Sequence, residues 1–355
     1  MLNNVVLIHC YKDFSPTLSN LTTYQFNDPA SRVCNGGNPM TTDSTRRELL
    51  ASSAAIAGAA LLSNWAHADA LSETKAKVVI VNTKEEISID KPAPQALVDK
   101  MLEKGITTLA GKSDPIQAWS SFVRPTDTVC LPTAGGQMEN IPEVNIAVYK
   151  ALQRLGVNKM TIGTHRLSSA WKDKVTEALQ GSLPEMITNG LFGIANRPMD
   201  ALVVTPTVKH HDIAGISGTL KLYACFSKLG PWNYHGETPI HSAHWDGVGG
   251  GGMGACGWVP ANDFKEQRKL HILDMIRVGV SSRGFTVFKD GWQFTKTLVL
   301  STDPVAADRV AFDIYLKVGQ ASGRIDPMNH VIRADTEYHS GISDLKRIDI
   351  RRVTV

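Results

Sequence analysis

The sequence predicts an α/β fold in which a largely parallel sheet is covered by flanking helices and interrupted by a Gly-rich insertion loop. Short, continuous apolar runs recur along the chain after residue 75, as in strands that are buried on both faces. Segments with helical spacing of their apolar residues separate these runs, and such alternation indicates a parallel sheet. The chain has 355 residues, of which 43% are hydrophobic and 20% charged, so it can bury a full core.

Seven apolar runs are the predicted strands. They lie at residues 77–81, 127–131, 159–163, 201–205, 270–273, 285–288 and 297–300. The C-terminal residues 347–355 alternate between apolar and polar side chains, which is typical of an edge strand. Because ligands bind beyond the carboxyl ends of parallel strands, we expect a site in the loops that follow these runs.

Five segments carry the spacing of amphipathic helices. They lie at residues 94–109, 115–122, 142–155, 168–179 and 304–316. The clearest runs from Pro142 to Leu155, where the apolar residues fall on one stripe and Gly156 follows as a C-cap. Asp303 and Pro304 are typical of a helix start, with the aspartate as the N-cap and the proline in the first turn.

The first 70 residues carry the pattern of an export signal rather than of a folded domain. Arg46 and Arg47 precede a weakly apolar run at residues 51–62 and a small-residue stretch at residues 66–70, as in twin-arginine signals. We therefore predict a signal peptide at residues 40–70, an upstream or disordered extension at residues 1–39, and a single α/β domain at residues 71–355. A buried core helix is the alternative interpretation of the apolar run.

Export by this route predicts a periplasmic or otherwise exported protein whose partners include the twin-arginine export machinery. The apolar run is too short and too rich in Ser and Ala for a stable membrane span, which needs about 20 apolar residues. The net charge of +3, from 37 basic and 34 acidic residues, is too balanced to predict binding to nucleic acid.

Known nucleotide and hydrolase motifs do not occur in this sequence. No GxGxxG, GxxxxGK[ST] or GxSxG motif follows a predicted strand. The five cysteines form no CxxC pair, which argues against a zinc ribbon or an iron–sulfur cluster. Two states of the three cysteines after residue 70 stay open: a disulfide between Cys225 and Cys256, or buried thiols at Cys130, Cys225 and Cys256.

Four blocks of sequence carry a family likeness. They are Asp114–Asp127 (with DPIQAW), Pro142–Val157, Val204–Lys221 (with VTPTVKHHD and ISGTLK) and Thr302–Val310 (TDPVAADRV). In content, order and spacing they resemble the domain of unknown function 362 family, in its twin-arginine-exported branch. The resemblance implies an α/β fold but no assigned chemistry.

The chain departs from the family pattern at two places. The family usually has Lys-Val-Asn or Lys-Pro-Asn after the second strand, where this chain has Pro132, Thr133 and Ala134. It usually has Asn after the second lysine, where this chain has Leu222. If those polar residues form the family's site, this chain lacks part of it.

The first candidate site combines Lys209, His211, Lys221 and Asp303. A lysine and histidines at the end of a buried strand can hold a carboxylate or phosphate, and a desolvated lysine can act as a base or a Schiff-base nucleophile. The alternative is structural. His211 and Asp212 would then begin a helix cap beside a solvated Lys209, and Asp303 would only cap its own helix.

The second candidate site is a metal site that combines His235, His241, His244 and Asp246, just before a segment in which seven of the residues 247–257 are glycine. Imidazole and carboxylate ligands suit a transition metal such as zinc, iron, copper or nickel. A long Gly-rich loop is also a candidate lid over the strand ends. The alternative interpretation is a polar surface loop.

Two functions remain open at this point. The first is an uncharacterised periplasmic protein that binds a small anionic molecule, with metal-assisted enzymatic activity as an extension. The second is a non-catalytic binding or accessory protein with a degraded family site. The sequence leaves open whether the chain is an enzyme.

Overall fold

Strands with apolar side chains on both faces form the centre of the computed structural model. Neighbouring side chains of a strand point to opposite faces, so a continuous apolar run requires cover on both. In β1 (Ala76–Asn82), Val78 and Ile80 belong to one core cluster, whereas Val79 and Val81 belong to the other. The structure describes residues 75–135, 138–164, 167–180, 185–187, 195–211, 214–226, 254–280, 291–319, 326 and 328–355.

Within the described residues, eleven strands form one mixed sheet, in which β11-β1-β10-β8-β5-β2-β3-β4 is the main order. The other strands pair at the side: β6 and β9 with β8, and β7 with β6. Beyond β1, the strands are β2 (Thr128–Thr133), β3 (Lys159–Thr164), β4 (Glu185–Ile187), β5 (Ala201–Val204), β6 (Thr207–His211), β7 (Gly215–Ser217), β8 (Arg268–Gly279), β9 (Trp292–Gln293), β10 (Thr297–Ser301) and β11 (Ile348–Thr354). Six of the ten pairings are parallel, which confirms the predicted fold class.

Strand direction divides the sheet into two edges. β10 runs antiparallel to both β1 and β8, so β1 and β8 point the same way. The strands β2, β3, β4, β5, β6 and β11 share that direction through parallel pairings. We call the edge where these strands end the carboxyl edge, and the edge where they begin the amino edge. Because β10 is reversed, it ends at the amino edge.

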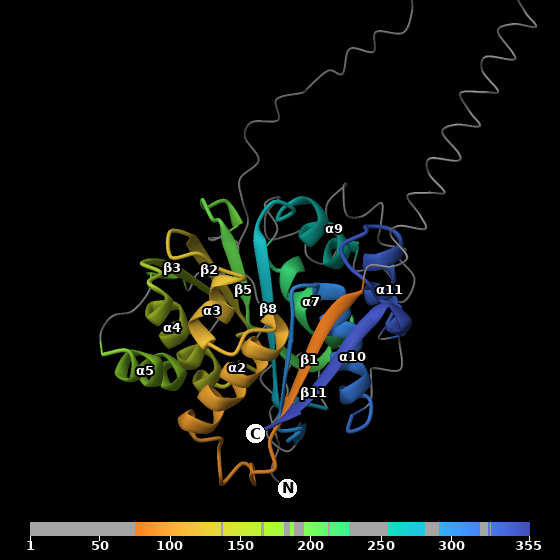
Figure 1. Ribbon diagram of the computed structural model, residues 1–355. Helices are drawn as coiled ribbons and strands as arrows, with labels where there is room; N and C mark the ends of the chain where they lie inside the picture. Colours follow the sequence, from red (N-terminus) through yellow and green to blue (C-terminus); the bar gives the residue numbers. More distant parts are fainter. Residues whose placement is uncertain are drawn as a thin grey trace, which may run out of the picture. The chain divides into compact units, whose positions relative to one another are not determined.

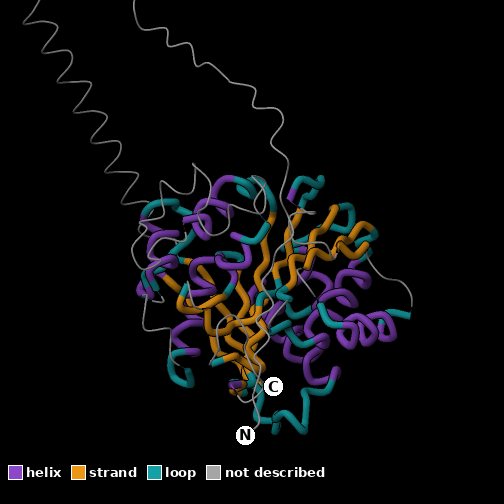
Figure 2. The backbone as a smooth tube through the Cα atoms, turned by 180° about the vertical axis from the view of Figure 1, so that it is seen from behind, coloured by secondary structure: helices purple, strands orange, loops and turns teal. Residues whose placement is uncertain are grey.

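Helices cover the two faces separately, as Figures 1 and 2 show from opposite sides. One face carries α2 (Gln95–Ala110), α3 (Pro115–Ser120), α4 (Pro142–Leu155) and α5 (Ser169–Ala178). The other face carries α7 (Thr219–Ala224), α9 (Gly254–Asn262), α10 (Pro304–Tyr315) and α11 (Asn329–Thr336). A short 3-10 turn, η3 (Leu345–Arg347), leads into β11. No helix within the described residues combines the length and the apolar composition needed to cross a membrane.

The predicted elements agree with the structure wherever long periodic runs occur. The predicted helix at residues 142–155 is α4, and Gly156 follows it in the left-handed conformation with φ 92°. β11 lies at the end of the sheet and pairs only with β1 among the described strands, as expected for an edge strand. The predicted strand at residues 285–288 lies outside the described residues. The short strands β4, β6, β7 and β9 were not predicted.

A buried carboxylate joins two of the family-like blocks. Asp308 of α10 accepts hydrogen bonds from the backbone N–H groups of Thr219 (2.7 Å) and Leu220 (2.8 Å), at the start of α7. A Cβ atom on Gly218 would lie 2.5 Å from Asp308 Oδ1, so only glycine lets the carboxylate approach. Asp308 therefore serves as the N-cap that α7 lacks in its own sequence.

We expect Asp308→Ala to lower the free energy of unfolding by about 2–4 kcal/mol, because two buried N–H groups lose their acceptor. Asp114→Ala is the matched control. Asp114 caps α3, which has six residues like α7, but it does so from an exposed position. The free energy of unfolding of Asp114→Ala should fall by only about 0.5–1 kcal/mol. Urea denaturation of both variants measures the difference, and equal losses would contradict a special role for Asp308.

Candidate functional site

Lys209 lies near the carboxyl edge of the sheet and is partly buried. It is the third residue of β6 and pairs with Gly279, the last residue of β8. Its Nζ atom donates a hydrogen bond to the carbonyl oxygen of Met138 at 3.0 Å, in the segment between β2 and α4. The alternative in which His211 begins a helix cap does not hold, because His211 ends strand β6, while Lys209 is partly buried and bonded to the backbone.

Lys221 of α7 lies close enough to Lys209 to change its ionisation. Burial lowers the pKa of Lys209 to about 8, and the positive charge of Lys221 acts in the same direction. Only the Cys225 thiol opposes this shift. Lys221 is itself buried, and its Nζ atom lies 3.1 Å from Cys225 Sγ. The structure thus brings together two of the predicted site residues, both cationic.

His211 ends the same strand as Lys209. Residues two apart in a strand face the same side, so the side chains of His211 and Lys209 leave β6 on one face. The Nδ1 atom of His211 accepts a hydrogen bond from the backbone N–H of Ala214 at 3.0 Å. This bond spans the connection between β6 and β7 and sets the orientation of the imidazole ring.

Asp303 lies at the opposite edge of the sheet from Lys209. It follows β10, in which Ser301 pairs with His271, whereas Lys209 pairs with Gly279 eight residues further along β8. At about 3.3 Å per residue, these two positions on β8 are roughly 26 Å apart. The reversed direction of β10 therefore separates Asp303 from the lysines with which the sequence analysis grouped it.

The carboxylate of Asp303 is engaged in a structural role. Its Oδ1 atom accepts from the N–H groups of Val305 and Ala306, both at 2.9 Å, and its Oδ2 atom accepts from Ile342 N–H at 2.9 Å. These bonds cap α10 and fasten the segment before η3. The structural interpretation of Asp303 as a helix cap thus accounts for its Oδ1 bonds, while its Oδ2 bond to Ile342 is an additional tertiary contact.

The segment that precedes α4 is held by side chains from the sheet, which the sequence analysis did not identify. Arg277 of β8 donates to the carbonyl oxygen of Glu139 at 3.2 Å, while its guanidinium lies 4.1 Å from the ring centroid of Trp292. Asp274 of the same strand accepts from Ile141 N–H at 2.7 Å. Burial raises the pKa of Asp274 to about 6. Two charged residues within an otherwise apolar run were the signal available in the sequence.

Neutral polar side chains occupy the end of β2, where the family usually has Lys and Asn. The hydroxyl groups of Thr133 and Thr205 are 3.0 Å apart, and Asn145 Nδ2 donates to them at 2.9 and 3.1 Å respectively. All three residues are completely buried. Positive charge near this edge comes instead from Lys209 of β6 and Arg277 of β8.

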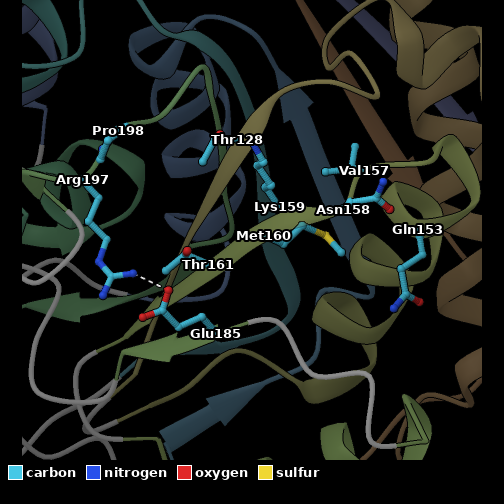
Figure 3. A pocket seen from close by; sticks show the side chains of 10 residues that line it. All are labelled: Thr128, Gln153, Val157, Asn158, Lys159, Met160, Thr161, Glu185, Arg197 and Pro198. Atoms are coloured by element: carbon cyan, nitrogen blue, oxygen red, sulfur yellow. Dashed lines mark hydrogen bonds and ion pairs between the residues drawn. The ribbon is translucent and has the colours of Figure 1, made fainter.

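A pocket of about 830 Å³ lies away from Lys209 and Lys221, neither of which lines it. Three of its lining residues, Thr128, Lys159 and Glu185, begin β2, β3 and β4 and therefore mark the amino edge. Figure 3 shows the ion pair between Glu185 and Arg197 in this pocket. Parallel sheets bind ligands at their carboxyl edge, so this pocket is not part of the candidate site.

The proposed metal ligands His235, His241, His244 and Asp246 lie outside the described residues. Within the part of the chain that the structure describes, no group of three or more His, Cys, Asp or Glu side chains could hold a metal ion. The end of the Gly-rich segment forms the start of α9, which packs against α7 and α11 and precedes the amino end of β8. This described end of the predicted lid therefore lies toward the amino edge.

The pH dependence of stability distinguishes the structural role of Asp303. Burial raises its pKa to about 6, from an ordinary value of 3.8, so the folded state holds a proton at pH 5 that the unfolded chain has released. This contribution to stability grows as the pH falls from 7 toward 4. In Asp303→Asn the side-chain amide cannot take up that proton. Its NH₂ group can also stand in place of Oδ2, so that Ile342 N–H loses its acceptor.

We therefore expect the stability lost in Asp303→Asn to be greater at pH 5 than at pH 7.5, by about 1–2 kcal/mol. Urea denaturation of wild type and variant at the two pH values measures this difference. A loss that stays constant or shrinks at pH 5 would contradict the raised pKa.

Comparison with known proteins agrees with the family likeness. A family model described as "Domain of unknown function (DUF362)" matches residues 148–313. The matched region contains the Val204–Lys221 and Thr302–Val310 blocks in full, and with them both lysines and Asp308. Neither a curated protein nor a solved structure matches the chain. The family-model match supports the resemblance to the domain of unknown function 362 family, while the twin-arginine-exported branch stays a prediction.

Proposed function

We propose that this chain is an exported protein that binds a small anionic molecule at Lys209 and Lys221, near the carboxyl edge of its sheet. The observation that carries the proposal is that the buried Lys221 lies close enough to the partly buried Lys209 for its charge to lower the pKa of Lys209. Burial removes hydration from an ammonium group, and a second positive charge adds repulsion. A bound carboxylate or phosphate would offset both costs.

Enzymatic activity is an extension of this proposal. A lysine with a pKa of about 8 is partly neutral near that pH, and a neutral amine can act as a base or as a nucleophile toward a carbonyl group. His211 lies on the same side of β6 and offers a second group for proton transfer. The reaction that these residues would support is left unassigned.

A non-catalytic binding or accessory role is the second candidate. It is favoured by the neutral triplet Pro132, Thr133 and Ala134, where the family usually has Lys and Asn. The hydrogen bond from Lys209 to Met138 also gives this lysine a positioning role that needs no ligand. Ligand binding without turnover would favour this candidate over an enzyme.

The metal and export parts of the proposal rest on sequence alone. His235, His241, His244 and Asp246 would hold a transition metal, and residues 40–70 would direct export through the twin-arginine machinery. Elemental analysis of the full chain and of a His241→Ala/His244→Ala variant tests the metal. A metal that is retained at equal stoichiometry in both proteins would remove these histidines as ligands.

Thermal unfolding in the presence of inorganic phosphate, succinate or citrate tests the anion site. At a ligand concentration 100 times Kd, stability should rise by about 2.7 kcal/mol, which raises Tm by roughly 5 °C for a domain of this size. We expect wild type to show this rise with at least one of these anions. Lys209→Met should lose most of it, because one of the two ammonium groups is absent.

Lys269→Met is the matched control. Lys269 is also partly buried and donates from Nζ to a carbonyl oxygen, that of Pro260 at 3.0 Å. Burial lowers its pKa as well, but its charged neighbours Glu266 and Asp303 are acidic. This variant should keep the full rise in Tm. Equal loss in both variants, or no rise in wild type with any of the three anions, would refute the proposal.

A further inference from the structure

Two cysteines on adjacent helices share one region of the core. Cys225 directly follows α7, and Cys256 lies in the first turn of α9, which packs against α7. Cys256 is completely buried in the core cluster on this face of the sheet, and the partly exposed Cys225 packs against the same cluster. Both are free thiols here, as is Cys130, so the Cys225–Cys256 disulfide that the sequence left open is not formed in this structure.

Lys221 distinguishes Cys225 from the other two described thiols. Its Nζ atom lies 3.1 Å from Cys225 Sγ, one helical turn away. Cys225 is only partly buried, so a reagent can reach its sulfur. The other two thiols are buried, and burial raises the pKa of Cys130 to about 11 and that of Cys256 even further.

Cys256 is placed to act as the second thiol. It lies in α9, which packs against α7, and both thiols adjoin the same core cluster. Cys130 lies on β2 and responds instead to Arg197 and Glu185, beside the amino-edge pocket. The structure therefore offers a partly exposed thiol, Cys225, that can attack a reagent, and a buried thiol, Cys256, in the adjacent helix.

We propose that Cys225 and Cys256 form a redox-active thiol pair whose substrate is a small-molecule disulfide. The Cys225 thiolate attacks one sulfur of the disulfide, forms a mixed disulfide and releases one thiolate, which takes up a proton. The Cys256 thiol then loses its proton and attacks Cys225 Sγ, so that the Cys225–Cys256 disulfide forms and the second thiol leaves. The protein loses two electrons and two protons, and the small-molecule disulfide gains them. The thiol pair shares Lys221 with the proposed anion site, but it needs neither Lys209 nor His211.

Treatment of the full chain with oxidised glutathione, followed by proteolysis and mass spectrometry, tests the pair. Wild type should yield a peptide pair linked through Cys225 and Cys256, with a loss of about 2 Da that dithiothreitol reverses. Cys256→Ser should stop at glutathione attached to Cys225. Cys225→Ser should leave Cys256 unmodified, and Cys130→Ser, the matched control, should close the disulfide as wild type does.

The rate of the first step tests Lys221. Lys221→Met should slow glutathione attachment to Cys225 by about tenfold in the Cys256→Ser background, whereas Lys221→Arg should restore most of the rate because it keeps the charge. Circular dichroism verifies that each variant is folded. If Lys221→Met does not fold, the Cys256→Ser trapping result decides the proposal.

Three outcomes would overturn the proposal. They are a linkage of either cysteine to a different partner, glutathione on Cys256 in Cys225→Ser, and failure of Cys256→Ser to accumulate the Cys225 adduct. None of them bears on phosphate or carboxylate binding by Lys209, so the two proposals can fail separately.

Discussion

Strand β10 runs against both of its neighbours, and this reversal determines which side chains share an edge of the sheet. β1 and β8 remain co-directional on either side of it, so their carboxyl ends meet those of β2, β3, β5 and β6. Lys209 consequently lies at the edge where α/β sheets bind ligands, and Asp303 is carried to the other. Had β10 been parallel, Asp303 would have faced the lysines.

Buried charges in this fold are bonded mainly to the backbone. Asp274, Asp303 and Asp308 each accept hydrogen bonds from N–H groups, and Arg277 and Lys209 each donate to a carbonyl oxygen. Such bonds compensate for lost hydration and fasten segments that have no regular structure of their own. Lys209 and Lys221 differ because the positive charge of Lys221 acts on Lys209, which is why the ligand proposal rests on this pair.

Much of the fold could be predicted from the sequence, because long elements leave a strong periodic signal. The stripe of α4 and the apolar runs of β1 and β10 need only local spacing to be identified. The short strands β6 and β7 leave too few residues for a period. The role of Asp308 is equally invisible, since its partners Thr219 and Leu220 are almost 90 residues away in the chain.

The sequence by itself determined the fold class, the principal helices and strands, and the helix-capping character of Asp303, since each depends on residues close along the chain. It also identified Lys209 and Lys221 as candidates through their position after a buried strand. Only the tertiary structure decided that Lys221 lies near Lys209 while Asp303 does not, and that α7 and α9 bring Cys225 and Cys256 to one core. Strand direction and helix packing are set by contacts between distant segments, which local spacing does not encode.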